Sequence, residues 1–324
     1  MRIHNVQVNR VVDFPMITPS SDSSIGTNIQ GPSVIKVPEW IKNPLGAYYL
    51  YFADHKGSYI RLAYADNPLG PWAIYSPGSL QLSESCFLTE APEISPEMLK
   101  EYELRRQGAA ISHDLLTEIS TPHIASPDVI VDSSNKLILM YFHGLESAGN
   151  QVSRLAFSDD GISFRARSAI LGRTYMRIFK YEGETYALSM PGQVYKSANG
   201  QDDFKEGPLL FNPNMRHSAV LVRDNVLLVF WTQVGDIPES ILLSRIDLTN
   251  HWMDWQAEDA IELLHPEFDW EGANAPLVPS VRSTAYGHVN QLRDPAILVN
   301  NDEVFLYYAI AGESGIAVVK IEID

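Results

Sequence analysis

The chain has 324 residues, 45% of them hydrophobic, and its 40 acidic residues outnumber the 24 basic ones to give a net charge of -16. This length can bury one large core or two of ordinary size, and the charge disfavours nucleic acid and anionic membranes as partners. The single cysteine, Cys86, excludes an internal disulfide and a cysteine-rich zinc site. No apolar run has the length of a signal-peptide core or of a membrane span. We therefore expect a cytoplasmic protein, or a periplasmic or secreted one if a leader has been removed.

Short runs rich in Val, Ile, Tyr and Phe recur along the chain between clusters of Gly, Asn, Asp and Pro, as in antiparallel sheet. They form five similar groups, at residues 32–75, 127–167, 175–204, 217–257 and 295–323. Such repetition predicts an all-β, five-bladed β-propeller, which we expect to be one domain over residues 1–324. The last group lacks a fourth strand, and the run 4–12 is expected to supply it and to cover the open sheet edge. A β-sandwich or two small barrels is the alternative.

The segment between the first two groups, residues 77–121, breaks the strand pattern. Ser95 suits a helix N-cap, Pro96 suits the first helical position, and Gly108 suits the end of the helix, just after two arginines. This pattern predicts a short helix. We expect the insertion to cover one face of the propeller as a lid or rim, or else to be a structural appendage.

Propeller geometry predicts which residues meet, because the first strand of each blade starts at the same face to which the loop between the second and third strands returns. Five of the nine histidines fall in these places, and a buried ionisable group persists when it is paired or used. The polar residues that we expect on this face are Asn28, His55, His123, Asp128, His143, Arg177, Arg216, His217, His288, Arg293, Asp294 and Glu313. Trp270, on the long connection before the last group, is expected to be a sugar-stacking platform.

Four motifs carry a resemblance to a known superfamily: GPSVI (31–35), SPDVI (126–130), RDPAI (293–297) and YLYFADHKGSYIRLAYADNPLGPW (49–72). With the five blades, they resemble the propeller glycoside hydrolases, most closely glycoside hydrolase family 43 and its relatives. The resemblance implies a carbohydrate substrate and a carbohydrate-active enzyme.

The chain departs from the family pattern at its catalytic positions. Family 43 members carry a base aspartate on the first blade, a pKa-tuning aspartate on the third and an acid glutamate on the fourth. The matching positions here hold Gly31, Arg177 and the pair Arg216 and His217. The resemblance is therefore to a hydrolase-like branch without the usual carboxylates, and any chemistry must be carried by other residues.

Hydrolysis of a glycosidic bond needs one group that protonates the leaving oxygen and another that activates water or attacks carbon. We assign His217 as the acid, as in a smaller propeller family that acts on anhydro-sugars derived from agar. Asp294 or Asp128 is assigned as the base. The expected substrate is an oligosaccharide that contains uronate, sulfated or anhydro-sugar units.

Alternatives to this mechanism remain open at the level of sequence. Arg177, Arg216 and Arg293 would bind a carboxylate or sulfate in bidentate fashion, and the same residues with a histidine base would suit a polysaccharide lyase. A propeller that binds sugar without turnover is a third hypothesis. No cofactor is predicted from the residues, although a calcium ion in the central channel is an open alternative because related propellers sometimes hold one there.

Overall fold

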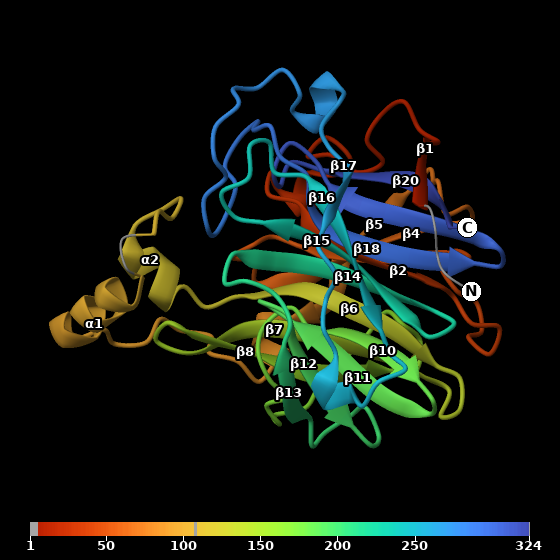
Figure 1. Ribbon diagram of the computed structural model, residues 1–324, viewed down its shortest axis with the longest axis horizontal. Coiled ribbons are helices and arrows are strands. Elements are labelled where there is room, and N and C mark those ends of the chain that lie inside the picture. Colours follow the sequence, from red (N-terminus) through yellow and green to blue (C-terminus); the bar gives the residue numbers. More distant parts are fainter. Residues whose placement is uncertain (1–5, 107–108, 324) are drawn as a thin grey trace.

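A computed structural model describes residues 6–106 and 109–323, and within them five four-stranded antiparallel sheets form the blades of a propeller (Figure 1). The first strands of the blades contact one another in a closed cycle. This arrangement confirms the predicted five-bladed β-propeller.

The first three blades contain the following strands in order from the axis outward. Blade one has β2 (Gln30–Lys36), β3 (Tyr48–Ala53), β4 (Tyr59–Ala65) and β5 (Ala73–Gln81). Blade two has β6 (Ile124–Asp132), β7 (Leu137–Ser147), β8 (Asn150–Ser158) and β9 (Arg165–Ala166). Blade three has β10 (Arg177–Tyr181), β11 (Glu184–Ser189), β12 (Gln193–Ser197) and β13 (Lys205–Leu209).

The last two blades bring the chain back to its beginning. Blade four has β14 (Met215–Arg223), β15 (Val226–Gln233), β16 (Ile241–Asp247) and β17 (Ile261–Leu264). Blade five has β18 (Arg293–Asn300), β19 (Glu303–Ala309) and β20 (Ile316–Ile323), and its outer strand is β1 (Val6–Arg10). β1 pairs antiparallel with β20, with Val8 opposite Ile321. The two ends of the chain therefore share one sheet, and the outer edge of β20 is covered.

The outer strand of blade four lies later in the chain than the sequence pattern predicts. The fourth group of the sequence ends with the run WMDWQA (252–257) as its expected last strand, but Trp252–Asp254 is a 3-10 helix, capped by the His251 side chain, and only Ala257 forms an isolated bridge to Ile246. The strand that pairs with β16 is β17 instead. The prediction was wrong because aromatic residues suit a strand and a packed turn equally well.

The insertion contains two helices, α1 (Pro96–Arg106) and α2 (Leu115–Ser120), where the sequence predicted one. The Ser95 hydroxyl accepts a hydrogen bond from the Met98 amide at 3.2 Å, so the predicted N-cap is present. The expected helix end at Gly108 lies outside the described residues. β5 runs on to Gln81, and the departure from the strand pattern begins there rather than at residue 77.

Each blade is apolar on both faces because it is packed between two others. In β3, Tyr49 and Tyr51 belong to the core between blades one and two, whereas Leu50 and Phe52 belong to the core between blades five and one. Successive strand residues point to opposite faces, so one continuous apolar run serves two interfaces. The described residues contain five such clusters, one for each pair of neighbouring blades.

The first strands of blades one, two and five begin with a bulge before a proline. The register of each strand shifts there, and the residue before the proline has positive φ: 64° at Gly31, 48° at Ser126 and 49° at Asp294. Positive φ does not by itself demand glycine, since serine and aspartate adopt it in the equivalent places. A Cβ atom at residue 31 would lie 2.9 Å from the Ser126 Cα atom. The close approach of blade two therefore accounts for the glycine.

Restoring the family aspartate at this position should destabilise the propeller instead of supplying a base. We expect Gly31→Asp to lower the free energy of unfolding by about 3 kcal/mol, which combines overpacking against Ser126 with the backbone strain of positive φ. Urea denaturation measures this change. The control is Gly183→Asp, because Gly183 also has positive φ, 81°, and nothing lies within 4 Å of its Cβ position. Equal losses in the two variants would show that contact with Ser126 is unimportant.

Candidate functional site

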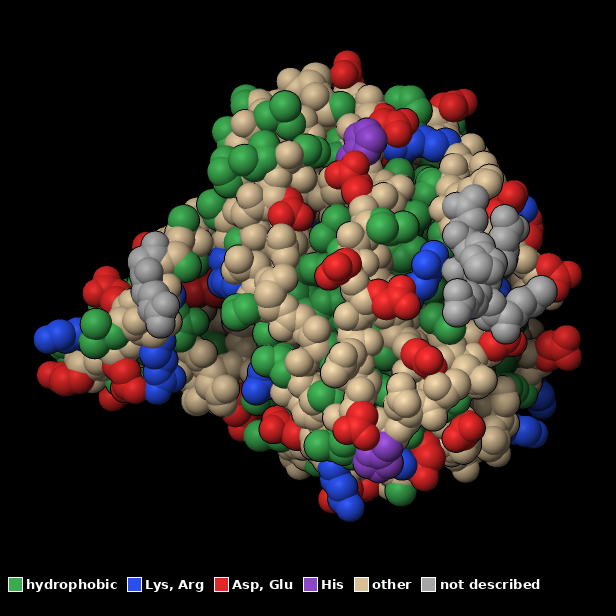
Figure 2. All heavy atoms as spheres, in the orientation of Figure 1, with side chains coloured by type: hydrophobic (Ala, Val, Ile, Leu, Met, Phe, Trp, Pro, Cys, Tyr) green, Lys and Arg blue, Asp and Glu red, His purple; other side chains and the backbone are tan. Residues whose placement is uncertain are grey.

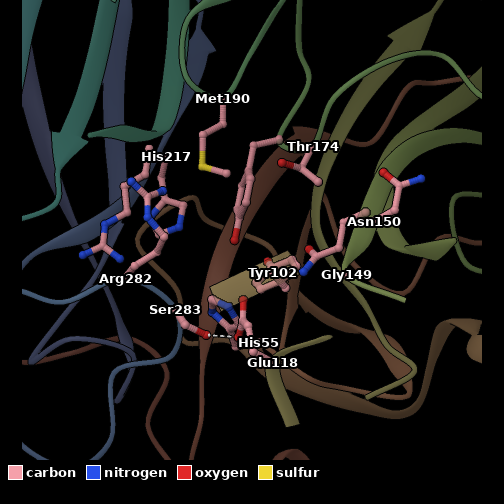
Figure 3. Close-up of a pocket in the computed structure, with 13 residues that line it drawn as sticks. His55, Tyr102, Glu118, Gly149, Asn150, Thr174, Met190, His217, Arg282 and Ser283 are labelled. Carbon is pink, nitrogen blue, oxygen red and sulfur yellow. Dashed lines mark hydrogen bonds between the residues drawn. The ribbon is translucent and has the colours of Figure 1, made fainter. Parts of the chain in front are cut away.

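A pocket of about 310 Å³ opens where the first strands start, on the face that the sequence predicts (Figure 3). This volume is within the usual range for a small-ligand site. Its wall combines the propeller with the helical insertion, which projects from the body in Figure 2. The lining residues are His55, Tyr102, Glu118, Gly149, Asn150, Gln151, Thr174, Tyr175, Met190, Arg216, His217, Arg282 and Ser283.

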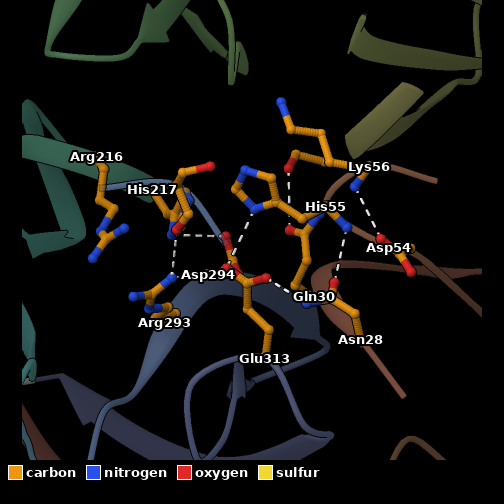
Figure 4. A network of polar contacts seen from close by, with 12 residues as sticks. Asn28, Gln30, Asp54, His55, Lys56, Arg216, His217, Arg293, Asp294 and Glu313 are labelled. Carbon is orange, nitrogen blue, oxygen red and sulfur yellow. Dashed lines mark hydrogen bonds and ion pairs between the residues drawn. The ribbon is translucent and has the colours of Figure 1, made fainter. Parts of the chain in front are cut away.

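His217, at the start of β14, lies directly against a buried carboxylate. Its Nδ1 atom is 2.8 Å from Oδ1 of Asp294, which stands at the start of β18 (Figure 4). The contact is an ion-pair contact, and neither His217 Nδ1 nor either carboxylate oxygen of Asp294 has a hydrogen-bond partner among the described residues. Burial lowers the pKa of His217, and the attraction of Asp294 does not offset it. A buried carboxylate without a hydrogen bond is costly to keep and calls for an explanation, which makes the His217–Asp294 pair a candidate functional centre.

A second imidazole of the pocket also has a carboxylate behind it. His55 Nδ1, in the β3–β4 loop, lies 3.3 Å from Glu313 Oε1, and Asn28 Nδ2 donates to Glu313 Oε2 at 2.7 Å. Burial raises the pKa of Glu313, but His55, Arg293 and Asn28 outweigh it and hold the pKa well below its usual range. The structure thus brings His55, Asn28 and Glu313 together as a neighbouring cluster (Figure 4).

Two buried arginines cross-link the blades beneath these histidines. Arg216 Nε donates to Glu239 Oε1 at 2.8 Å, and a second nitrogen of the same guanidinium contacts Oε2. Arg293 Nη1 donates to Glu313 at 2.8 Å, while Arg293 Nε lies 3.5 Å from Glu239. All four side chains are almost fully buried. Burial raises the pKa of Glu239, but the two arginines outweigh it and lower the pKa overall. Arg216, Glu239, Arg293 and Glu313 are called the buried charge cluster below.

An aromatic stack forms one side of the pocket. The Tyr175 ring lies between two imidazoles, with its centroid 4.5 Å from that of His143 and 4.7 Å from that of His217. His123 packs next to His143 at 6.0 Å. Burial lowers the pKa of His123 to about 3 and that of His143 well below its ordinary value. Both histidines are therefore neutral at pH 7. They pack behind the pocket wall and are not among the residues that line the pocket.

Asp128, which the sequence suggested as a base, does not reach the pocket. Its Oδ2 atom accepts a hydrogen bond from the Ile178 amide at 2.8 Å, just as Ser33 in the equivalent place accepts one from Val129. Both side chains therefore link the first strands of neighbouring blades. Asp128 lines a separate cavity of about 110 Å³ along the strands, so this candidate base lies away from the pocket that His217 lines.

All three expected anion-binding arginines have partners within the protein, and Arg216 is held by Glu239 as described above. Arg177 donates to the carbonyl oxygens of Pro127 and Ser218 at 2.9 and 2.7 Å, and Arg293 is held in the buried charge cluster. Trp270 is also misplaced by the sequence interpretation, because it stacks on Phe268 and packs against the core between blades four and five. The structure therefore leaves the expected anion-binding role of Arg177 and the stacking role of Trp270 without support. Arg177 meets its partners across separations of 41 and 50 residues, which the sequence pattern does not record.

Several pocket residues were not singled out from the sequence. Tyr102 and Glu118 come from the insertion, and Arg282 and Ser283 come from the long connection before blade five. Tyr175 precedes β10 and has a φ of 59°, which is rare for an aromatic residue. The helix capping signals predicted a helix in the insertion, but sequence alone does not show which of its side chains turn inward.

The channel residues do not fit a calcium ion. Within residues 6–106 and 109–323 there is no group of three or more His, Cys, Asp or Glu side chains arranged to hold a metal, and the cavity beside Asp128 also contains Arg177. Calcium prefers six to eight oxygen ligands, and a neighbouring guanidinium opposes a cation. Of the helices in the same described residues, none is both long and apolar enough to cross a membrane.

Comparison with known proteins supports the fold and identifies a relative. No family model matches the chain. The uncharacterized protein R118 of Acanthamoeba polyphaga mimivirus is 35% identical over 316 residues, which cover 90% of this chain and 82% of the viral protein.

Solved structures with the same fold include glycoside hydrolases. One, from work on the GH130 family of mannoside phosphorylases and glycoside hydrolases that target β-1,2-mannosidic linkages in Candida mannan, has a TM-score of 0.62 at 9% identity, over 98% of this chain and 94% of that one. A putative glycoside hydrolase from Parabacteroides distasonis has a TM-score of 0.59 at 11% identity, over 95% and 90%. An endo-1,4-β-xylanase from Bacteroides thetaiotaomicron has 0.56 at 12% identity, over 92% and 94%. At the level of the fold, the resemblance to the propeller glycoside hydrolases is confirmed.

The buried charge cluster predicts a large effect of neutralising one glutamate. We expect Glu239→Gln to lower the free energy of unfolding at pH 7 by about 3 kcal/mol, because it leaves Arg216 and Arg293 buried with less compensation. The folded-state pKa of Glu239 is lowered, so its stabilisation is complete above the unfolded pKa of roughly 4.3 and is lost as pH falls through the folded pKa. Denaturant unfolding at several pH values measures both effects.

The control for this variant is Glu303→Gln. Glu303 pairs with Lys320 at 3.0 Å on the surface, where its side chain is 49% exposed, and this change should alter stability by less than about 1 kcal/mol. Comparable losses in the two variants would contradict the importance of the buried charge cluster.

Proposed function

Because the chain belongs to the same protein family as the mimivirus protein R118 and folds as a glycoside-hydrolase-like five-bladed propeller, we propose that it is a carbohydrate-active enzyme that cleaves a glycosidic bond. The observation that carries the proposal is the pair of His217 and Asp294 at the pocket wall. A propeller fold is compatible with many functions, and catalysis depends on the residues of this site.

His217 is the proton-transfer group of the proposed reaction. Its Nδ1 atom faces Asp294, while Nε2 has no hydrogen-bond partner among the described residues and belongs to the ring that lines the pocket. In hydrolysis, protonated His217 gives a proton to the leaving oxygen as the glycosidic carbon–oxygen bond breaks, and water bonds to the anomeric carbon. Asp294 stabilises the imidazolium form through its negative charge. Asp294 thus acts through His217, in place of the separate base role suggested by the sequence.

The lowered pKa of His217 supports a second candidate, a lyase mechanism. Burial lowers this pKa below its usual value, so the neutral form of the His217 imidazole predominates at pH 7. A neutral imidazole removes protons, as elimination next to a uronate carboxylate requires. A hydrolase that uses His217 as its acid should instead work best in acid, where the imidazole is protonated.

Arg282 is the guanidinium best placed for the anionic part of a substrate. It lines the pocket, and its Nη2 atom donates to the Pro213 carbonyl at 3.0 Å. Unlike Arg216, it forms no ion pair among the described residues. A guanidinium binds carboxylate or sulfate in bidentate fashion. We therefore propose that the substrate is an oligosaccharide that contains uronate or sulfated sugars. An oligosaccharide that contains anhydro-sugars is a further candidate.

A panel of oligosaccharides identifies the reaction. The panel contains neutral, uronate-containing, sulfated and anhydro-sugar members, and each reaction is followed by reducing-end release and by ultraviolet absorbance. Reducing sugar without absorbance indicates hydrolysis, whereas a new conjugated double bond indicates elimination. Binding without either product would reject catalysis in favour of a sugar-binding propeller.

Loss of either member of the pair should abolish turnover without unfolding the protein. We expect His217→Gln and Asp294→Asn to reduce kcat at least about 100-fold, the usual scale of proton-transfer catalysis. Asparagine tolerates the positive φ at residue 294, so the backbone conformation there should be unchanged in Asp294→Asn. The measure is steady-state kinetics on the best substrate of the panel.

The matched control is Asp224→Asn. Asp224 has a φ of 50° and lies exposed in the turn between β14 and β15. This variant should keep full activity. Wild-type kcat in His217→Gln would remove that residue from the mechanism.

The dependence of kcat/KM on pH shows whether His217 donates a proton as an acid or accepts one as a base. With a pKa below 6.5, a catalytic acid at this position gives a kcat/KM that falls as pH rises through that pKa. A catalytic base gives a kcat/KM that rises over the same range. The profile of the wild type is measured from pH 4 to 9, and the limb assigned to His217 should disappear in His217→Gln.

A further inference from the structure

The helical insertion places one carboxylate in the pocket that the proposed mechanism has not used. Among the described residues that line the pocket, Glu118 is the only aspartate or glutamate. It lies on α2, which begins after Asp114, whose side chain caps the Thr117 amide at 2.9 Å. The amide of Gly149, in the β7–β8 turn, donates to the Ile119 carbonyl at 2.7 Å and holds this helix against blade two.

The contacts of Glu118 are all on one oxygen. Oε2 lies 2.6 Å from His113 Nε2 and accepts a hydrogen bond from the Ser283 hydroxyl at 2.8 Å. Lys56 Nζ lies 3.6 Å from the same atom. Within the described part of the chain, Oε1 has no hydrogen-bond partner, although the carboxylate lines the pocket. One oxygen therefore holds the side chain in position while the other is open to a ligand or to water.

The carboxylate is ionised at neutral pH. Burial raises the pKa of Glu118, but Lys56, Ser283, His55 and His113 outweigh it, and the pKa is lowered overall. A lowered pKa keeps the carboxylate in the negative form that can accept a proton, although it also makes Glu118 a weaker base than one whose pKa lies near the working pH.

Glu118 and His217 reach the pocket from different sides. Figure 3 shows His217 on one wall of the pocket and Glu118 at its lower end, beside Ser283 and His55. A hydrolytic site that inverts configuration needs its acid and its base on opposite faces of the sugar, with room for water at the base. The pocket contains a candidate for each role. His217, with Asp294 behind it, is the candidate acid, and the oxygen of Glu118 that has no hydrogen-bond partner among the described residues is the candidate base.

We propose that Glu118 is the general base that activates water, in the place of the aspartate that Gly31 excludes from blade one. This inference rests on the proposed glycosidic function of the same pocket. Glu118 takes a proton from water while the water oxygen bonds to the anomeric carbon. The glycosidic bond breaks at the same time, and its oxygen takes the proton of His217. Water and the glycoside are the only reactants, and the products are two sugars.

Glu118 also connects the insertion to the propeller through Ser283, so a purely structural role must be separated from the catalytic one. Glu118→Gln keeps the shape and an oxygen that accepts from Ser283, but it cannot take a proton. Glu118→Ala opens space for a small anion. Thermal unfolding of each variant reports the structural contribution, and kinetics at matched folded concentration report the catalytic one.

The first experiment measures hydrolysis of the best panel substrate. We expect kcat to fall at least about 100-fold in Glu118→Gln. The control is Glu101→Gln on α1, where the side chain is 63% exposed and pairs with Arg105; it should keep wild-type kcat. Wild-type kcat in Glu118→Gln rejects the base role while the proposed function stands. Failure of the wild type to release reducing sugar from any substrate, or release of an absorbing product, rejects hydrolysis itself.

The second experiment uses the 2,4-dinitrophenyl glycoside of the sugar that the wild type releases. Its leaving group needs no acid, so His217→Gln should regain activity on it and Glu118→Gln should not. Sodium azide attacks carbon without giving up a proton, and it should accelerate Glu118→Ala with formation of a glycosyl azide of inverted configuration. Recovery of Glu118→Gln on the aryl glycoside, or no effect of azide on Glu118→Ala, would overturn the assignment.

Discussion

The pairing of two arginines with two glutamates below the pocket is the constraint on which the rest of the site depends. Arg216 and Arg293 start the first strands of blades four and five, and Glu239 and Glu313 stand on loops of the same blades. Each charge is tolerated in the interior only because the others compensate it. The residues that follow the arginines in the chain, His217 and Asp294, are thereby brought to 2.8 Å of each other.

The propeller makes such a cluster possible because its blades are held rigidly by their apolar faces. Every inner strand is packed on two neighbours, and backbone amides of one blade bind side chains of the next, as Ile178 binds Asp128. Interiors of this density leave little freedom for a strand start to move. Polar residues at those starts can therefore be placed for chemistry, while loops and the helical insertion complete the pocket around them.

The contact between blades one and two explains why blade one lacks the carboxylate of the family pattern. At Gly31, Ser126 lies too close for any side chain, although Asp294 occupies the equivalent bulge of blade five without obstruction. Acidic side chains are instead found behind the histidines and on the insertion. In our proposal the catalytic roles are redistributed in the same way, from blade one to blade five and α2.

The sequence by itself determined the five blades, the face on which polar residues gather and the position of His217 at the pocket. These features follow from local patterns: alternating strand residues, turn residues between them, and the geometry that repeats from blade to blade. Only the tertiary structure decided that Arg293 is paired, that Asp128 links two strands and that Glu118 enters the pocket. Arg293 meets Glu313 and Glu118 meets Ser283 across separations of 20 and 165 residues. Whether a charged side chain is paired or open depends on desolvation and on partners from distant parts of the chain, which the spacing of residues along the chain does not record.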